Sequence, residues 1–120
     1  MNEGDVVLAP LAQADGKLKN RPAIVLCRMP PFGDLLVCGV STQLQHAVSG
    51  FDEVIEILDA DFAASGLKSA SLIRLGFLSV LPTNNFVGRI GSISAGRHRG
   101  LLTRLSDFLR PGAASQRQSP

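Results

Sequence analysis

Residues 22–42 decide the fold: they read Pro-Ala-Ile-Val-Leu-Cys-Arg at 22–28, Pro-Pro-Phe-Gly-Asp at 30–34 and Leu-Leu-Val-Cys-Gly-Val-Ser-Thr at 35–42. The two outer runs are apolar and of strand length, which is typical of buried strands. The Pro and Gly residues between them form a strong turn signal. The sequence therefore predicts an antiparallel β-hairpin, whose register would place Cys27 and Cys38 offset from each other. We expect both cysteines to be small, reduced core residues.

Short strands are also expected on either side of this hairpin. One precedes it at residues 4–10, followed by a polar loop at 11–20, and others follow it at residues 52–58, 69–75, 77–81 and 86–91. Gly76 is expected as a bend or bulge between two of them. Residues 59–65 are expected to form one helical turn, with Asp59 as its cap and Gly66 as its stop.

The hydrophobic period changes near the end of the chain. Five apolar residues are spaced so that they share one face of a helix: Leu101, Leu102, Leu105, Phe108 and Leu109. Pro111 and Gly112 end this helix, and residues 111–120 are expected to be a disordered tail. The predicted fold class is mainly β with short helices, a small, strongly bent β-barrel with a C-terminal α-helix, in a single domain over residues 1–110.

Composition limits the class of protein. The chain has 120 residues, of which 45% are hydrophobic, and this length suits one domain with its own core. No window approaches the roughly 18 apolar residues of a membrane span. The acidic start at residues 1–5 shows no secretory signal, so we expect a cytoplasmic protein that does not enter a membrane. The two cysteines form neither a Cys-x-x-Cys metal pair nor a disulfide scaffold.

Charge is unevenly distributed along the chain. Residues 1–61 contain four basic and nine acidic residues, whereas residues 62–120 contain eight basic residues and one acidic residue. The basic half is able to attract a polyanion or to complement an acidic partner, and solubility alone also explains it. Aromatic residues, which strengthen an interpretation as a binder of single-stranded nucleic acid, are six Phe without Trp or Tyr.

The motifs together resemble the PemK/MazF toxins of type II toxin–antitoxin systems. The most specific part is Gly-Asp-Val-Val at 4–7 in register with Arg-Pro-Ala-Ile-Val-Leu at 21–26. The resemblance spans about residues 3–110, and its further segments are 40–45, 66–68, 71–75 and 87–90. It implies an SH3-like barrel that forms a homodimer and cleaves single-stranded RNA without a metal or other cofactor. It also implies an antitoxin that occludes the site, and binding to operator DNA only as the toxin–antitoxin complex.

The resemblance implies catalytic roles for Arg21 and Ser41. The 2′-hydroxyl would attack the adjacent phosphorus, giving a 2′,3′-cyclic phosphate and a 5′-hydroxyl. Arg21 would place two donors on the phosphate oxygens, which Lys does less well. Ser41 would bond a phosphate oxygen or orient the 2′-hydroxyl, with Thr42 as the alternative one position on. The hairpin register that pairs Ile24 with Cys38 also brings Arg21 beside Ser41.

Other polar residues are candidates for RNA binding. Gln43 and Gln45 would read bases, His46 is a candidate base that contacts RNA, and Arg74 matches a basic strand residue of the family. Each also has an ordinary interpretation as loop filler, a surface histidine or a solvated strand face. Lys19 completes the set of candidate RNA ligands. His98, between two arginines, is expected at the surface where the helix begins or as a phosphate contact, rather than as a catalytic residue.

Departures from the family pattern affect the expected activity. Many members have an acidic residue where this chain has Gly76, and a second Arg where it has Ser79. A carboxylate base is therefore missing at that place. The apolar run at 77–81 suggests a changed dimer face. Two alternatives stay open: a toxin of the same fold that binds a protein such as gyrase through a hydrophobic helix end, and a catalytically silent homologue that binds RNA or DNA.

Overall fold

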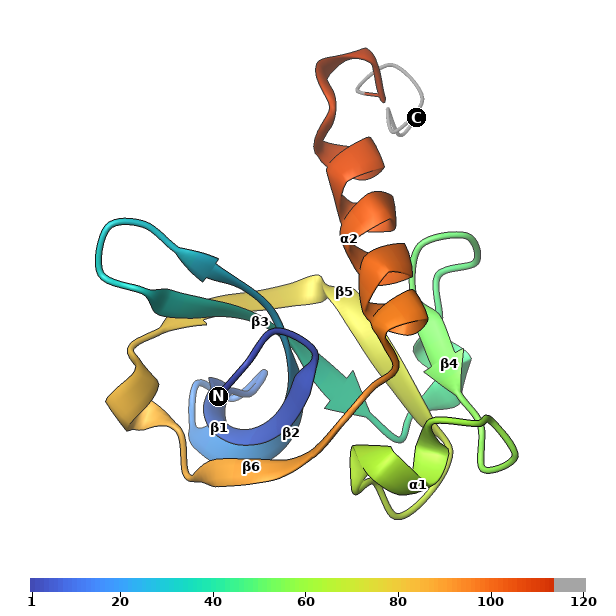
Figure 1. The fold of residues 1–120 in the computed structure, drawn as a ribbon, viewed down its shortest axis with the longest axis horizontal. Coiled ribbons are helices and arrows are strands. Elements are labelled where there is room, and N and C mark those ends of the chain that lie inside the picture. Colours follow the sequence, from blue (N-terminus) through green and yellow to red (C-terminus); the bar gives the residue numbers. More distant parts are fainter. Residues whose placement is uncertain (114–120) are drawn as a thin grey trace.

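A computed structural model describes residues 1–113 and shows one six-stranded antiparallel sheet that curls into a half-open barrel (Figure 1). The strand order is β4-β5-β3-β2-β1-β6. The strands are β1 (Asp5–Ala12), β2 (Leu18–Met29), β3 (Asp34–Ser41), β4 (Glu53–Ile55), β5 (Ser71–Leu81) and β6 (Gly88–Ser92). The helices are α1 (Phe62–Ser65) and α2 (Ala95–Leu109), and single 3₁₀ turns lie at Leu44–His46, Thr83–Asn85 and Pro111–Ala113. The predicted fold class is confirmed.

The predicted hairpin is β2 with β3, and its register is the expected one. Ile24 pairs with Cys38, whereas Cys27 pairs with Leu36, so the two cysteines are offset. Both thiols are free. Cys38 is fully buried, and burial raises the pKa of its thiol to about 12. Cys27 is only half-buried and lies 3.7 Å from the Met29 sulfur, so just one of the two is a core residue.

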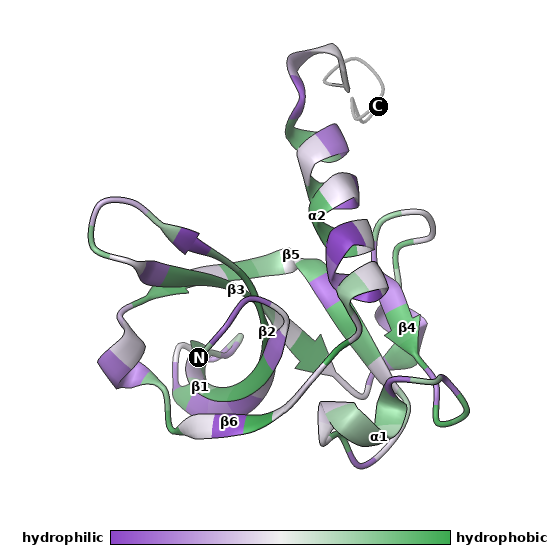
Figure 2. Ribbon diagram, viewed as in Figure 1, coloured by the Kyte–Doolittle hydropathy of each residue, from purple (hydrophilic) through white to green (hydrophobic). Residues whose placement is uncertain are grey.

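Apolar side chains form two clusters, one on each face of the curled sheet. The cluster inside the barrel includes Val7, Leu11, Val25 and Phe86. The cluster on the other face packs under α2 and includes Leu26 and buried residues of the helix, Leu101 and Leu105. Figure 2 shows the apolar residues concentrated in the central strands β2 and β3.

The predicted apolar face of the last helix is confirmed only over its first part. Leu101 and Leu105 are buried, whereas Leu109 is exposed where α2 extends beyond the sheet (Figure 1), and Phe108 is 41% exposed with its ring centre 4.7 Å from that of Phe51. The helix ends before Pro111, as predicted. The expected tail begins with the 3₁₀ turn Pro111–Ala113, and its residues 114–120 lie outside the described part of the chain. No helix in that described part is both long enough and apolar enough to span a membrane.

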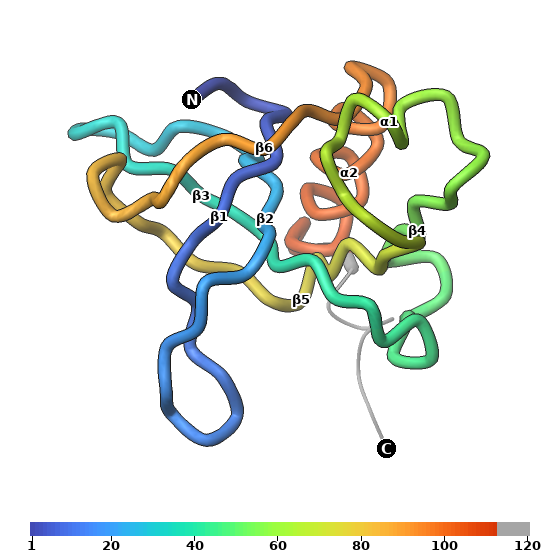
Figure 3. The backbone as a smooth tube through the Cα atoms, turned by 90° about the horizontal axis from the view of Figure 1, so that it is seen from below, coloured from blue at the N-terminus to red at the C-terminus, as the bar shows by residue number. Residues whose placement is uncertain are grey.

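Several predicted boundaries were wrong. The loop expected at residues 11–20 spans only 13–17, because β1 and β2 continue as a hairpin that projects from the body (Figure 3). The strand expected at 52–58 is only β4, three residues long. The two strands expected around Gly76 form one strand, β5, but the bulge expected at Gly76 is confirmed: Arg74 pairs with Gly39 and Leu78 with Cys38, which leaves residues 75–77 unpaired.

The cap of the short helix α1 was also predicted wrongly. Asp61, not Asp59, occupies the N-cap position, and its carboxylate makes no capping bond. It accepts hydrogen bonds instead from the Ser94 backbone N–H and from Arg97. The predicted stop is confirmed, because Gly66 ends α1 in the left-handed conformation with φ of 74°.

Arg97 joins the basic and acidic halves of the chain. Its guanidinium donates to Glu53 at 2.7 Å, to Asp59 at 2.9 Å and to Asp61 at 2.8 and 3.0 Å. These bonds hold the pKa of Asp61 down at about 2 and raise that of Arg97 above its usual range. The uneven charge of the sequence is thus balanced in part within the molecule, where α2 begins beside β4 and α1.

Candidate functional site

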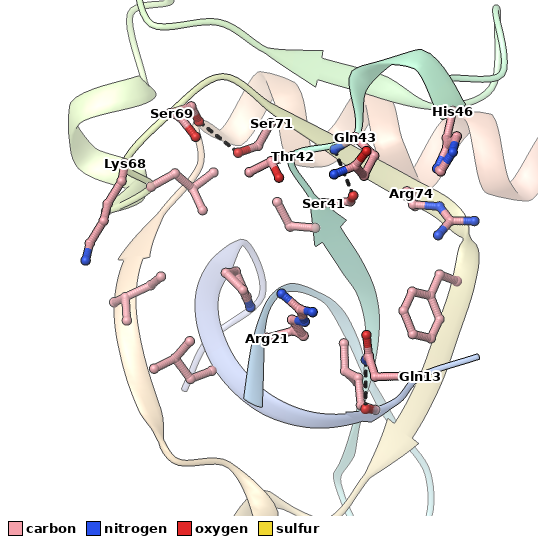
Figure 4. Close-up of a pocket in the computed structure, with 18 residues that line it drawn as sticks. Gln13, Arg21, Ser41, Thr42, Gln43, His46, Lys68, Ser69, Ser71 and Arg74 are labelled. Carbon is pink, nitrogen blue, oxygen red and sulfur yellow. Dashed lines mark hydrogen bonds between the residues drawn. The ribbon is translucent and has the colours of Figure 1, made fainter. Parts of the chain in front are cut away.

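A cavity of about 690 Å³ opens at the end of the barrel where β2 begins and β3 ends (Figure 4). This volume is in the usual range for a small-molecule site. Apolar residues from several strands and from the α1–β5 loop line part of it: Leu8, Leu11, Pro22, Val40, Leu67, Phe77 and Ile90. Its polar lining consists of Gln13, Arg21, Ser41, Thr42, Gln43, His46, Lys68, Ser69, Ser71 and Arg74.

Arg21 and Ser41 reach this cavity from paired strands. The β2–β3 ladder ends at Ala23 opposite Gly39, and the same register two residues further places Arg21 beside Ser41. Both side chains line the cavity, and Figure 4 draws Arg21 at its centre with Ser41 and Thr42 on the side toward β3. The hairpin therefore brings together the two residues singled out from the sequence, although their catalytic roles remain predictions.

The Ser41 hydroxyl is oriented by the chain that follows it. Its Oγ accepts a hydrogen bond of 3.0 Å from the Gln43 backbone N–H. A serine hydroxyl has one proton to donate as well as lone pairs that accept. Because the oxygen accepts from the backbone, the proton stays available for an acceptor in the cavity.

Most of the other predicted ligands lie at the same cavity. Thr42, Gln43, His46 and Arg74 all line it. Gln45 does not, but its side-chain amide donates to the Gln43 side chain at 2.8 Å and so restrains a lining residue.

Two basic candidates lie away from the cavity. Lys19 is exposed on β2 in the projecting hairpin and does not line the cavity, so its role as an RNA ligand stays a prediction. His98 lies in the first turn of α2, as expected, but its ring is half-buried: Nε2 lies 2.8 Å from the Leu26 carbonyl oxygen, and the residue does not line the cavity.

The bulge in β5 shapes one wall of the cavity. The Arg74 guanidinium carbon lies 5.7 Å from the centre of the Phe77 ring, a cation–π distance. Phe77 fits there because Gly39 has no side chain: a Cβ at that position would lie 2.7 Å from the ring. Gly76 is exposed and lines a smaller neighbouring cavity, and Ser79 pairs with Val37 further along β5. Gly76 and Ser79 therefore lie outside the main cavity, whereas Phe77, in the same departing run, lines it.

Sequence reasoning missed several polar residues that line the cavity. Gln13, Lys68, Ser69 and Ser71 all line the cavity. The Lys68 segment is held there because α1 and the residues that follow it pack on β6: a side chain on Gly66 would collide with the Ile90 carbonyl oxygen. The available signal was the Gly-Leu-Lys segment at 66–68, which belonged to the family resemblance but had no role assigned to it.

The charged side chains that line the cavity are all positive. Three cations line it, Arg21, Lys68 and Arg74, and no carboxylate does so among residues 1–113. Within the same part of the chain none of the three has an ion-pair partner, whereas four other arginines do: Arg89, Arg97, Arg104 and Arg110. An unpaired set of cations without a carboxylate favours an anionic ligand.

Within residues 1–113, the side chains form no cluster suited to a metal ion. Across the described residues, no three His, Cys, Asp or Glu side chains come together in such a group. The lining side chains offer charge stabilisation by guanidinium, hydrogen bonding by hydroxyl groups and proton transfer by the imidazole of His46.

Comparison with known proteins places this geometry in a recognisable fold. No family model and no curated protein matches the chain. Among solved structures it is similar to the toxin MazF-mt6 of Mycobacterium tuberculosis, with a TM-score of 0.63 over 86% of this chain and 93% of the other. The fold is that of a MazF toxin. Because the sequence identity is 19%, the likeness establishes the MazF-like architecture and not its chemistry.

Proposed function

We propose that this chain is the endoribonuclease toxin of a toxin–antitoxin system, which cleaves single-stranded RNA in the cytoplasm without a metal. The observation that carries the proposal is the convergence of Arg21 and Ser41 on one cavity that contains unpaired cations and no carboxylate within the described chain. A phosphodiester gains charge in its transition state, so preorganised donors around it lower the barrier. The MazF-like fold supports the same conclusion.

The lining residues suit the steps of this reaction. The 2′-oxygen attacks phosphorus as its proton passes to a base, and the bond from phosphorus to the 5′-oxygen breaks as that oxygen takes up a proton. Arg21 stabilises the charge on the equatorial oxygens, and the Ser41 proton bonds one of them. His46 is the only imidazole among the lining residues and is proposed as the base.

The proposed function also implies partners for the chain. A second copy of the chain would complete the active form, and an antitoxin would occlude the cationic cavity. An acidic antitoxin segment has the complementary charge for the three unpaired cations. Operator DNA would be bound only by the complex of toxin and antitoxin.

The test is cleavage of a long single-stranded RNA in EDTA. The expected products carry 2′,3′-cyclic phosphate and 5′-hydroxyl ends. Arg21→Ala should lower kcat by about 10²–10³-fold, as loss of one charge-stabilising donor does elsewhere, and Arg21→Lys by less. Arg99→Ala is the matched control, because Arg99 is exposed on α2 and does not line the cavity. Full activity in a folded Arg21→Ala variant would contradict the proposal.

A second candidate function is supported by the end of α2. Leu109 is 63% exposed there, and Phe108, whose ring packs on Phe51, is 41% exposed. Such a helix end fits a toxin that binds a protein target instead of RNA. Intact RNA together with inhibited DNA supercoiling by gyrase would favour this function, and RNA binding without products would favour a silent homologue.

A further inference from the structure

The three cations of the cavity stand on three separate parts of the fold. Arg21 lies on β2 in the middle of the sheet, and Arg74 lies on β5 toward one edge. Lys68 lies in the α1–β5 loop, which packs on β6 at the other edge. Because the sheet curls, its two flanks face each other across the cavity, and Figure 4 draws Arg21 between the Lys68 side and the Arg74 side.

We propose that a single strand of RNA crosses the cavity from the Lys68 side to the Arg74 side, so that Lys68 binds a phosphate flanking the scissile one at Arg21. The inference rests on the proposed function and deepens it: the substrate is a polynucleotide with flanking phosphates, not a mononucleotide or dinucleotide. A single phosphate at Arg21 would leave Lys68 and Arg74 without a ligand.

The charge and surroundings of Lys68 support this assignment. Its ammonium has no described partner within residues 1–113, and the neighbouring Ser69 and Ser71 place hydroxyl groups along the same wall. The Ser71 hydroxyl donates its proton to the Ser69 carbonyl at 2.8 Å, whereas the Ser69 hydroxyl has a proton that it can donate to an anion in the cavity. Lysine acts on phosphate as a flexible point charge, which suits a flanking site better than the reacting one.

The apolar residues that line the cavity between the cations form a surface for the sugars and bases of the strand. Leu8, Pro22 and Val40 lie between the two flanks, and Leu67 and Ile90 extend this surface toward Lys68. Sugars and base faces are able to pack on such a surface while phosphates meet the cations. The Phe77 ring on the Arg74 side adds one aromatic surface for a base.

The position of Lys68 depends on backbone packing and not on its own side chain. Gly66 and Gly91 bring α1 and β6 so close that a Cβ on either glycine would meet backbone atoms of the other segment. This contact fixes the loop that carries Lys68. A substitution of the Lys68 side chain therefore removes its charge without disturbing the wall.

The test measures binding of a random-sequence pool of single-stranded 2′-deoxy octanucleotides, which lack the attacking hydroxyl and are not cleaved. Each lysine–phosphate contact on a single strand contributes about 0.7 to the slope of log K against log salt. Lys68→Met should reduce that slope by about 0.7, and so should Arg74→Met. Lys17→Met should leave it unchanged, because Lys17 is exposed at the tip of the β1–β2 hairpin and does not line the cavity.

The outcomes separate this inference from the proposed function. A normal slope in Lys68→Met, with RNA cleavage still dependent on Arg21, overturns the flanking-phosphate site and leaves the nuclease standing. If Lys68→Met and Lys17→Met reduce the salt slope equally, the overall positive charge of the protein attracts the strand without a specific phosphate site, and the inference is also overturned. An unmutated protein that neither binds the octanucleotides nor cleaves RNA contradicts both.

Discussion

Asp61 shows how one side chain serves two parts of the molecule. It starts α1, yet its carboxylate binds Arg97 and the Ser94 N–H, so that it fastens α1 to the beginning of α2. Sequence reasoning placed the cap at Asp59, because the residue type alone does not distinguish a cap from a partner 36 positions away. Local propensity was right about the helical turn and its glycine stop, and wrong about the long-range contact.

This contact predicts a dependence of stability on pH. Hydrogen bonds from Arg97 hold the pKa of Asp61 at about 2, below its ordinary value of 3.8. The carboxylate therefore contributes fully above about pH 4 and loses its contribution as the pH falls toward 2, a difference on the order of 2 kcal/mol. Urea unfolding at several pH values should show this loss in the unmutated protein and a smaller one in Asp61→Asn. An unchanged pH dependence in that variant would contradict the assignment.

Elements formed by local patterns were predicted from the sequence, and elements shaped by distant contacts were not. The alternation of apolar runs and turn residues gave the β2–β3 hairpin with its register, because both strands and their turn are contiguous. The bulge at Gly76 was predicted, but the short length of β4 and the continuation of β5 through the bulge were not. Phe77 fits beside the bulge because Gly39 on β3 has no side chain. Arg21 and Ser41 were found because the hairpin joins them. Lys68 was missed because its loop reaches the cavity only through the packing of α1 on β6, two segments that are distant in the sequence.

The contact between α1 and β6 gives a prediction at the level of elements. A Cβ on Gly91 would collide with the backbone of Ala64 and Ser65, so Gly91→Ala must push α1 away from β6. Overpacking of this kind costs about 1–3 kcal/mol, which chemical denaturation would measure. Gly88→Ala on the same strand is the control, since a Cβ there meets nothing within 4 Å. Equal stability of the two variants would show that the segments separate without cost.

At the level of the whole molecule, two groups of basic residues stand apart, those held in ion pairs and those that face the cavity. Acidic residues of the first half hold Arg89, Arg97 and Arg104 in ion pairs. The basic residues left unpaired at the cavity are Lys68 and Arg74, joined by Arg21 from the first half. Counting charges along the chain gave the imbalance, but only the fold separates the paired cations from those that face the cavity.

The exposed apolar residues of β5 predict how two copies associate. Leu78 and Val80 are 39% and 50% exposed and pair with Cys38 and Leu36, so they lie on the same face of the sheet as α2, which does not cover them. Uncovered apolar residues on a sheet face are stabilised by a partner, and the proposed homodimer supplies one of matching chemistry. We expect Leu78→Lys with Val80→Lys to convert the dimer to a monomer in sedimentation analysis, because two charges would be buried without partners.

A second pair of exposed apolar residues provides the control. Ile57 and Leu58 are 61% and 96% exposed in the loop between β4 and α1, at a distance along the sheet from the end of β5. Ile57→Lys with Leu58→Lys adds the same charge and should leave the dimer intact. If instead this control dissociates and the β5 variant remains dimeric, the association surface lies at the β4–α1 loop, and the exposed residues of β5 must be assigned to another partner.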